Sequence, residues 1–200
     1  MEQPTDFLLL QFGVDPAAVP ELGPAVARLC AESRVPLQLH RLAGTPSGEF
    51  YLYLRAPAGS RLPAQALPPL AALLQRHVAA ARDVRVSRLQ LVFEAPGHSC
   101  AQVPGYHYVV ETDPEEGWMD EIARWYDTEH MPGLAAVPGC ILALRCLNHD
   151  HGPVSLACYD LVSDEVLGSP PWLAVRHTAW SNIARPHFTN TRRTMFRALD

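Results

Sequence analysis

The chain has 200 residues, of which 48% are hydrophobic and 18% are charged. This composition is that of a globular protein with a buried core and not of a disordered chain. The formal net charge of −5 gives no electrostatic footprint for nucleic acid. No apolar run reaches the roughly 20 residues that span a bilayer, and no signal-peptide pattern opens the chain, so we expect a cytoplasmic protein with no membrane partner.

The first half of the chain predicts six elements in the order β-α-β-β-α-β. Short apolar or alternating runs indicate the strands, and apolar residues at helical spacing indicate the helices. The expected elements are a strand over 6–12, a helix over 16–32, strands over 35–42 and 50–54, a helix over 70–81 and a strand over 84–94. This order is the ferredoxin-like split-βαβ motif.

The same order returns about 100 residues later, after a predicted linker over 95–105. Thr112 and Glu115 have capping-box spacing, which predicts a helix that starts at Pro114 and ends near Pro132. The expected elements are a strand over 106–111, a helix over 114–130, strands over 140–147 and 154–162, a helix over 171–182 and a strand over 189–197. We therefore predict two domains, 1–98 and 105–200, related by an internal duplication.

The helix expected at 114–130 carries the strongest candidate for chemistry. Ile122, Tyr126 and His130 are four residues apart and share one face. A histidine at the end of an apolar face suits an acid/base group at the edge of a pocket. The alternative is that His130 caps the helix by bonding to nearby carbonyls.

Residues 125–132 (WYDTEHMP), the Val137-Pro138-Gly139 turn and the strand residue Arg145 together resemble the signature of the EthD-like family. That family belongs to the dimeric α/β-barrel superfamily, and the resemblance covers 106–197. It implies an α+β fold in which two ferredoxin-like βαββαβ repeats form a dimeric-α/β-barrel-type arrangement, here within one chain. The N-terminal half lacks the histidine signature and is expected to be degenerate.

The resemblance also implies roles for particular residues. The candidate catalytic residues are His130, Arg145 and Tyr108, and the candidate substrate-binding residues are Trp125, Tyr126, Trp180 and Tyr159. Arg145 could hold a carboxylate or enolate oxygen, or it could be a solvated or salt-bridged strand arginine. Trp125 and Tyr126 could line the pocket or simply pack in the core. Tyr108 and His107 are neighbours on one strand, so at most one of them faces the pocket.

No metal or cofactor is expected. The five cysteines form no CxxC pair, and His149, Asp150 and His151 fall in a hairpin turn. Superfamily relatives include haem enzymes, but the sequence offers no defensible haem ligand.

The function predicted is a small-molecule enzyme of the isomerase, cyclase or cofactor-independent monooxygenase type. It would act on a small apolar oxygenated molecule through a histidine acid/base in an apolar pocket. The first alternative is a non-catalytic hydrophobic-ligand-binding or accessory protein of the same fold, and the second is a duplicated fold with a filled core. The sequence leaves a homodimer open.

Overall fold

The computed structural model describes residues 2–199. The chain folds as two compact units. The N-terminal unit comprises Met1–Gln90, Asn148–His151 and Phe196–Asp200, and the C-terminal unit comprises Leu91–Leu147 and Gly152–Met195. The long strands β6 (Arg82–Pro96) and β10 (Phe188–Ala198) each begin in one unit and end in the other.

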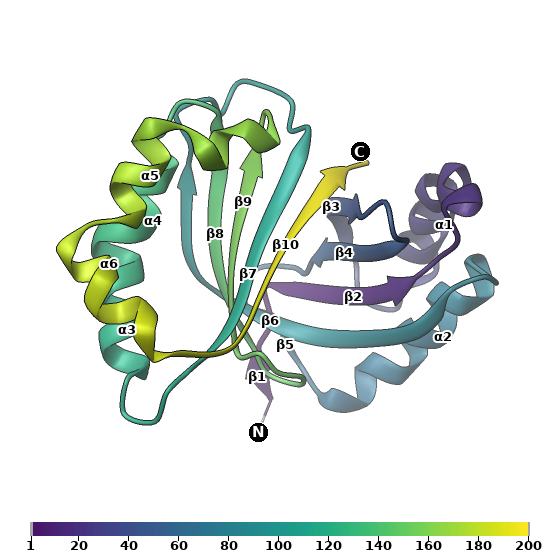
Figure 1. The fold of residues 1–200 in the computed structure, drawn as a ribbon. Coiled ribbons are helices and arrows are strands. Elements are labelled where there is room, and N and C mark those ends of the chain that lie inside the picture. Colours follow the sequence, from purple (N-terminus) through teal and green to yellow (C-terminus); the bar gives the residue numbers. More distant parts are fainter. Residues whose placement is uncertain (1, 200) are drawn as a thin grey trace. The chain divides into compact units, whose positions relative to one another are not determined.

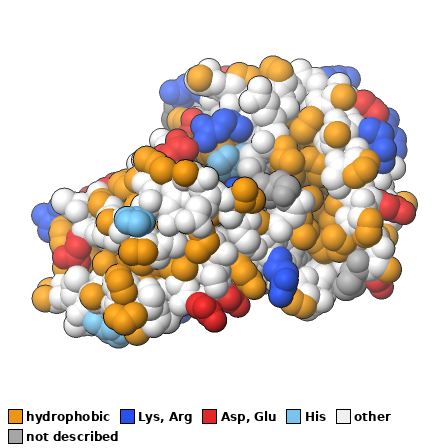
Figure 2. Space-filling view, turned by 90° about the horizontal axis from the view of Figure 1, so that it is seen from above, with side chains coloured by type: hydrophobic (Ala, Val, Ile, Leu, Met, Phe, Trp, Pro, Cys, Tyr) orange, Lys and Arg blue, Asp and Glu red, His pale blue; other side chains and the backbone are white. Residues whose placement is uncertain are grey.

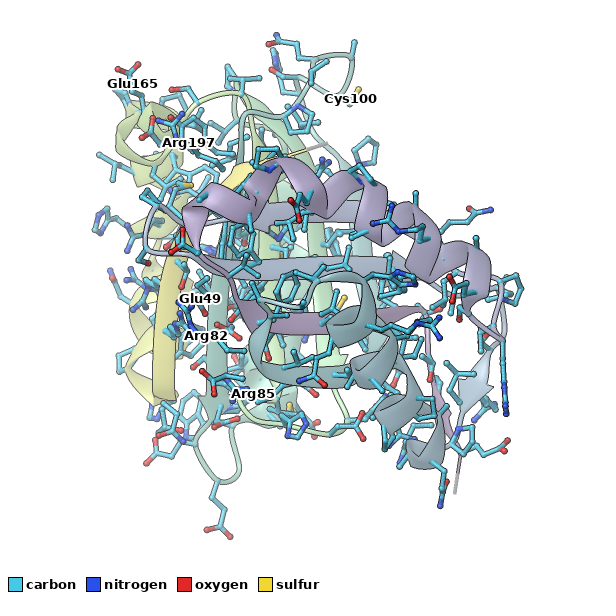
Figure 3. All side chains as sticks on the ribbon, turned by 90° about the vertical axis from the view of Figure 1, so that its right-hand side faces the viewer. Glu49, Arg82, Arg85, Cys100, Glu165 and Arg197 are labelled. Atoms are coloured by element: carbon cyan, nitrogen blue, oxygen red, sulfur yellow. The ribbon has the colours of Figure 1, made fainter. Side chains whose placement is uncertain are left out.

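The N-terminal unit is an antiparallel sheet with two helices on one face (Figures 1 and 3). In the sheet β2 lies between β4 and β6, and β3 pairs with β4 and with the end of β10. Its further elements are β1 (Gln3–Pro4), β2 (Phe7–Gly13), η1 (Pro16–Ala18), α1 (Val19–Glu32), β3 (Gln38–Gly44), β4 (Glu49–Arg55), β5 (Arg61–Leu62), η2 (Ala64–Ala66) and α2 (Leu67–His77).

Burial of apolar stripes holds this unit together. Leu8 and Leu10 alternate along β2 and pack against Leu22 and Leu29 of α1, and all four are fully or almost fully buried. Fully burying one leucine side chain stabilises a fold by about 2 kcal/mol, so this layer supplies much of the driving force.

The C-terminal unit has a second antiparallel sheet with all its helices on one face (Figure 1). In this sheet β9 lies between β7 and β8. Its elements besides β6 and β10 are β7 (Tyr106–Pro114), α3 (Met119–Trp125), η3 (Tyr126–His130), α4 (Met131–Ala135), β8 (Cys140–Asn148), β9 (Ser155–Leu161), η4 (Asp164–Gly168), α5 (Pro170–Arg176), α6 (Ala179–Ala184) and η5 (Arg185–His187).

The hydrogen-bonded strands follow one closed order, β10-β3-β4-β2-β6-β8-β9-β7. The predicted α+β fold with a barrel-type sheet of eight strands is thereby confirmed.

The predicted helix start at Thr112 is wrong. Thr112 is fully buried in β7, where it pairs with Ser155, and its hydroxyl donates to the carbonyl of Thr189 at 3.0 Å. The Asp113 carboxylate accepts a hydrogen bond from the Val154 amide at 2.7 Å. These partners keep the segment in the strand, and the helix begins only at Met119.

The third predicted helix is three consecutive segments, α3, the π-helical turn η3 and α4. Pro132 does not end the helix as predicted but occupies the first turn of α4, where its missing N–H costs least. π-helical turns of this kind are rare and occur often at functional sites. Here the turn contains both Tyr126 and His130.

The predicted helix over 171–182 is interrupted at His177. The Thr178 hydroxyl accepts a hydrogen bond from the Ser181 amide at 3.1 Å and so starts α6 as a new helix. The chain direction therefore changes between α5 and α6. This change matters because Arg176 ends α5 and Arg185 follows α6.

Within residues 2–199, none of the helices combines the length and the apolar character needed to span a membrane. On the face drawn in Figure 2, arginine side chains stand in small separate groups among apolar and acidic ones. That face therefore carries no continuous basic surface among the described residues. Cys140, Cys146 and Cys158 are buried in the apolar strands β8 and β9.

Candidate functional site

A small cavity lies between the helices and the sheet of the C-terminal unit. Its volume is about 30 Å³, and together with the open space at its mouth the hollow measures about 380 Å³. It is lined by Tyr108, Val110, Trp125, Tyr126, His130, Leu134, Tyr159, Trp172, Arg176, Arg185, Phe188 and Arg193. An enclosed volume of this size holds one or two water molecules, whereas pockets for drug-sized ligands measure roughly 300–1,000 Å³. A larger ligand therefore requires side chains at the mouth to move.

The π-helical turn directs His130 into this cavity. The imidazole stacks on the Trp125 ring at 4.2 Å between centroids and meets the Tyr126 ring edge-on at 5.6 Å. Its Nδ1 is buried and has no hydrogen-bond partner among the described residues. The sequence alternative, in which His130 bonds to backbone carbonyls, is not what the structure shows. Leaving such a nitrogen unpaired costs about 1–3 kcal/mol, which points to a role in binding or chemistry.

Burial keeps His130 neutral. Burial, together with a smaller effect of the nearby guanidinium groups of Arg185 and Arg176, lowers the pKa of the imidazole from 6.5 to about 3. At neutral pH the ring is therefore an uncharged imidazole that can accept a proton. A helix C-terminus would favour the protonated imidazolium, but at His130 the neutral imidazole is the more stable form.

Three tyrosines and two tryptophans form the walls. Burial raises the pKa of Tyr108, Tyr126 and Tyr159, so their hydroxyls stay protonated at neutral pH and can donate hydrogen bonds. The Tyr159 hydroxyl already donates to the Met131 sulfur at 2.9 Å. Trp172 packs edge-on against Tyr159 at 5.2 Å. The walls are thus mostly aromatic with a few neutral polar groups.

Five of the seven predicted site residues line the cavity: Tyr108, Trp125, Tyr126, His130 and Tyr159. The structure also places His107 on the opposite face of β7 from Tyr108, where its Nδ1 lies 2.7 Å from the Asp160 carboxylate.

The lining does not include Arg145 or Trp180. The Arg145 guanidinium donates to Asp127 at 2.9 Å and lies over the Tyr126 ring at 5.4 Å. Arg145 therefore contacts two residues of the π-helical turn, Asp127 and Tyr126, without lining the cavity. Trp180 donates through its indole N–H to the Glu121 carboxylate at 2.8 Å.

Sequence reasoning missed the arginines at the mouth. Arg176 ends α5, Arg185 starts η5, and Arg193 lies on β10. No local pattern could have joined the three, since only the tertiary fold brings their elements together.

The N-terminal unit has a hollow of about 230 Å³, whose lining includes Glu49, Arg82 and Arg85 (Figure 3). It combines charges of both signs and has no aromatic enclosure like that around His130. In residues 2–199 no three His, Cys, Asp or Glu side chains gather as a metal site would require.

No protein-family model matches the chain, and no curated protein matches it in sequence. Solved structures do match in fold. A candidate monooxygenase from Lactobacillus acidophilus NCFM has a TM-score of 0.65 at 10% identity, over 98% of this chain and 93% of that one. An anthrone oxidase-like protein has a TM-score of 0.64 at 12% identity, over 99% and 93%. The heme-degrading enzyme of Listeria monocytogenes has a TM-score of 0.55 at 8% identity, over 96% and 98%.

The chain has the ferredoxin-like, dimeric α/β-barrel fold. These identities are low, so the similarity extends to the fold and not to the chemistry.

The cavity does not fit a haem group. A macrocycle needs a pocket of several hundred Å³, whereas the 30 Å³ here is enclosed by Trp125, Tyr159 and Trp172. These three side chains are almost completely buried. No haem chemistry is therefore assigned to His130.

Proposed function

We propose that the chain is an enzyme that removes a proton from a small aromatic, oxygenated molecule bound beside His130. The observation that carries the proposal is the neutral, buried imidazole with an unpartnered Nδ1 inside an aromatic cavity. A general base must be uncharged to accept a proton, must lie within reach of the substrate and works best with a pKa near the working pH. His130 is uncharged and lines the space where a substrate would bind, and an anion bound beside Arg176 and Arg185 would raise its pKa from about 3 toward that range.

The other side chains have supporting roles. Trp125 and Tyr159 would hold the ring of the substrate, and the neutral hydroxyls of Tyr108 and Tyr126 would donate to its oxygen atoms. Arg145 would act as a positioning residue that holds the π-helical turn through Asp127. Arg145 would thus act through Asp127 and not through the contact with a substrate oxygen that the sequence predicted.

The similar structures favour oxygen chemistry over isomerisation or cyclisation, since they include a candidate monooxygenase and an anthrone oxidase-like protein. For a methylene compound the balanced reaction is R₂CH₂ + O₂ → R₂C=O + H₂O. His130 takes one proton from the CH₂ carbon, the carbanion gives an electron to O₂, and the resulting carbon radical and superoxide combine to form the C–O bond. The peroxide takes the proton back from His130 as R₂CH–OOH, and loss of the remaining C–H proton breaks the O–O bond and gives R₂C=O and water. An EthD-like origin of the C-terminal unit is part of this proposal.

The test is turnover in air of anthrone and of a set of anthrones that carry a phenol or carboxylate group, followed by oxygen uptake and product mass. We expect the wild-type protein to exceed the rate in buffer, and His130→Gln to lower kcat by about 10²–10⁴-fold. His98→Gln is the matched control, because His98 is an exposed histidine of the same unit.

Rates equal to buffer with every compound would refute the enzyme proposal. Binding without turnover would instead favour the non-catalytic ligand-binding protein.

A further inference from the structure

Three arginine side chains from three separate elements line the mouth of the cavity. Arg176 comes from the end of α5, Arg185 from the start of η5 and Arg193 from β10. Arg176 and Arg185 are half-buried, and Arg193 is exposed. Arg185 also donates to the carbonyl of Arg176 at 3.2 Å, which fixes one guanidinium against the end of α5.

These three charges lack a carboxylate partner in the part of the chain that the structure describes. Among residues 2–199, no ion pair of the structure includes Arg176, Arg185 or Arg193. Burial and the repulsion from Arg176 and Arg193 lower the pKa of Arg185, and only the tyrosines Tyr108 and Tyr126 oppose that change.

Two other buried arginines of the chain each have a carboxylate partner. Arg145 pairs with Asp127, and Arg88 pairs with Asp150. Three neighbouring guanidinium groups without an acid repel one another, and the two half-buried ones, Arg176 and Arg185, are also partly desolvated, so the free protein is under electrostatic strain at this point. An anion placed between them would remove the repulsion.

The cluster is directly coupled to the candidate base. Arg185 and Arg176 are the two charged groups that act on His130, whose Nδ1 is buried without a partner. The same cavity is walled by aromatic rings. A ligand that suits both the aromatic walls and the arginine cluster has a flat apolar body and a negatively charged oxygen group at one end.

We propose that Arg176, Arg185 and Arg193 bind the anionic oxygen group, a carboxylate or an ionised phenol, of an aromatic substrate whose ring enters the cavity beside His130. This inference rests on the proposed function, because it names the substrate class of the same site. The ring needs more than the enclosed 30 Å³, so the side chains of Arg176 and Arg193 must move outward as it enters and then close on the anion, while Arg185 stays bonded to the carbonyl of Arg176.

A nucleic-acid backbone fits this cluster poorly. The arginines face one small aromatic hollow and do not form a stripe. The chain as a whole carries a net charge of −5, which opposes binding of an extended polyanion.

The test compares benzoate with its neutral isostere benzamide by isothermal titration calorimetry on the full chain. We expect benzoate to bind at least tenfold tighter than benzamide. Arg176→Gln and Arg185→Gln should each weaken benzoate binding by roughly tenfold, since a charge-assisted hydrogen bond is lost, and should leave benzamide binding unchanged. Arg193→Gln should weaken it less, because that side chain is exposed.

Arg124→Gln is the matched control. Arg124 is an exposed arginine of the same unit that pairs with Glu121 and does not line the cavity. Its replacement should change neither affinity. Unchanged thermal unfolding of each variant shows that the fold is intact.

Equal affinities for benzoate and benzamide, or a benzoate affinity that all three substitutions leave unchanged, would overturn the inference. The two proposals fail separately. Turnover that depends on His130 but not on the arginines refutes only the anion site. Benzoate binding that depends on the arginines, with no turnover of any compound, refutes only the enzyme proposal.

Discussion

Replacement of His130 by glutamine should make the protein less sensitive to mild acid. In the unfolded chain a histidine takes up a proton as the pH falls below its ordinary pKa of 6.5, whereas burial holds the pKa of His130 in the folded protein at about 3. Between these values the unfolded state binds more protons than the folded state. The free energy of unfolding therefore falls as the pH falls through this window.

The size of the effect follows from the two pKa values. At pH 7.5 both states are neutral at this position, so His130 contributes almost nothing to the pH dependence. At pH 5 the unfolded histidine is almost fully protonated and the folded one is not, which lowers the free energy of unfolding by about 2 kcal/mol. Only 8% of the residue is exposed, so solvent screening reduces this little.

Urea unfolding at pH 7.5 and at pH 5 measures this term directly. The wild-type protein should lose about 2 kcal/mol more than His130→Gln over this interval, and His98→Gln should behave like the wild type. Equal losses in the wild type and in His130→Gln would show that the imidazole is not held neutral by burial. That result would also remove the reason for assigning it the role of a base.

Two further predictions concern the framework of the protein, one in each unit. Gly139 has a φ of +95°, and an added Cβ would lie 2.5 Å from a methyl carbon of Val166, so Gly139→Ala should lower the free energy of unfolding by about 2–4 kcal/mol. Gly117→Ala, at a φ of +83° in open space, should cost only about 1 kcal/mol, and equal costs in urea unfolding would contradict this reasoning. Asp150 accepts from the Arg88 amide and Nη2, both at 2.7 Å, and from Nε at 3.0 Å, so Asp150→Asn should destabilise the protein by about 3 kcal/mol. A change below about 0.5 kcal/mol in the same assay would show that this ion pair contributes nothing measurable.

The order of strands and helices was predictable because apolar periodicity reports which face of an element is buried. The strand around Leu8 and Leu10 and the helix around Leu22 and Leu29 are clear examples. The capping-box pattern at Thr112 failed for a reason outside local sequence. A hydroxyl that could cap a helix instead bonds to Thr189, which is 77 positions further along the chain.

The candidate site was predictable only in part. Tyr126 and His130 are near neighbours in sequence, and their helical spacing placed them together correctly. Arg145 also reaches this region, but its charge is taken up by Asp127, a partner that no spacing rule identifies. Arg176 and Arg185 join the cavity because the chain turns between α5 and α6, and the sequence predicted one continuous helix there.

The His149-Asp150-His151 turn illustrates the same limit. Its composition is compatible with a metal site, but its position between two strands predicts a plain hairpin turn. The structure uses Asp150 as the partner of Arg88 on β6, which is 62 residues away in sequence. A long-range ion pair of this kind leaves no local signature.

The measurement that tests the central claim most directly is a ¹⁹F NMR titration of the protein labelled with 5-fluorotryptophan. The chain has four tryptophans, and two of them, Trp125 and Trp172, line the cavity. Trp118 stacks on His187, and Trp180 bonds to Glu121, so these two serve as internal controls. Addition of benzoate should shift the resonances of Trp125 and Trp172 and leave the other two unchanged. Shifts confined to Trp118 and Trp180, or no shift at saturating benzoate, would show that the cavity beside His130 is not the binding site.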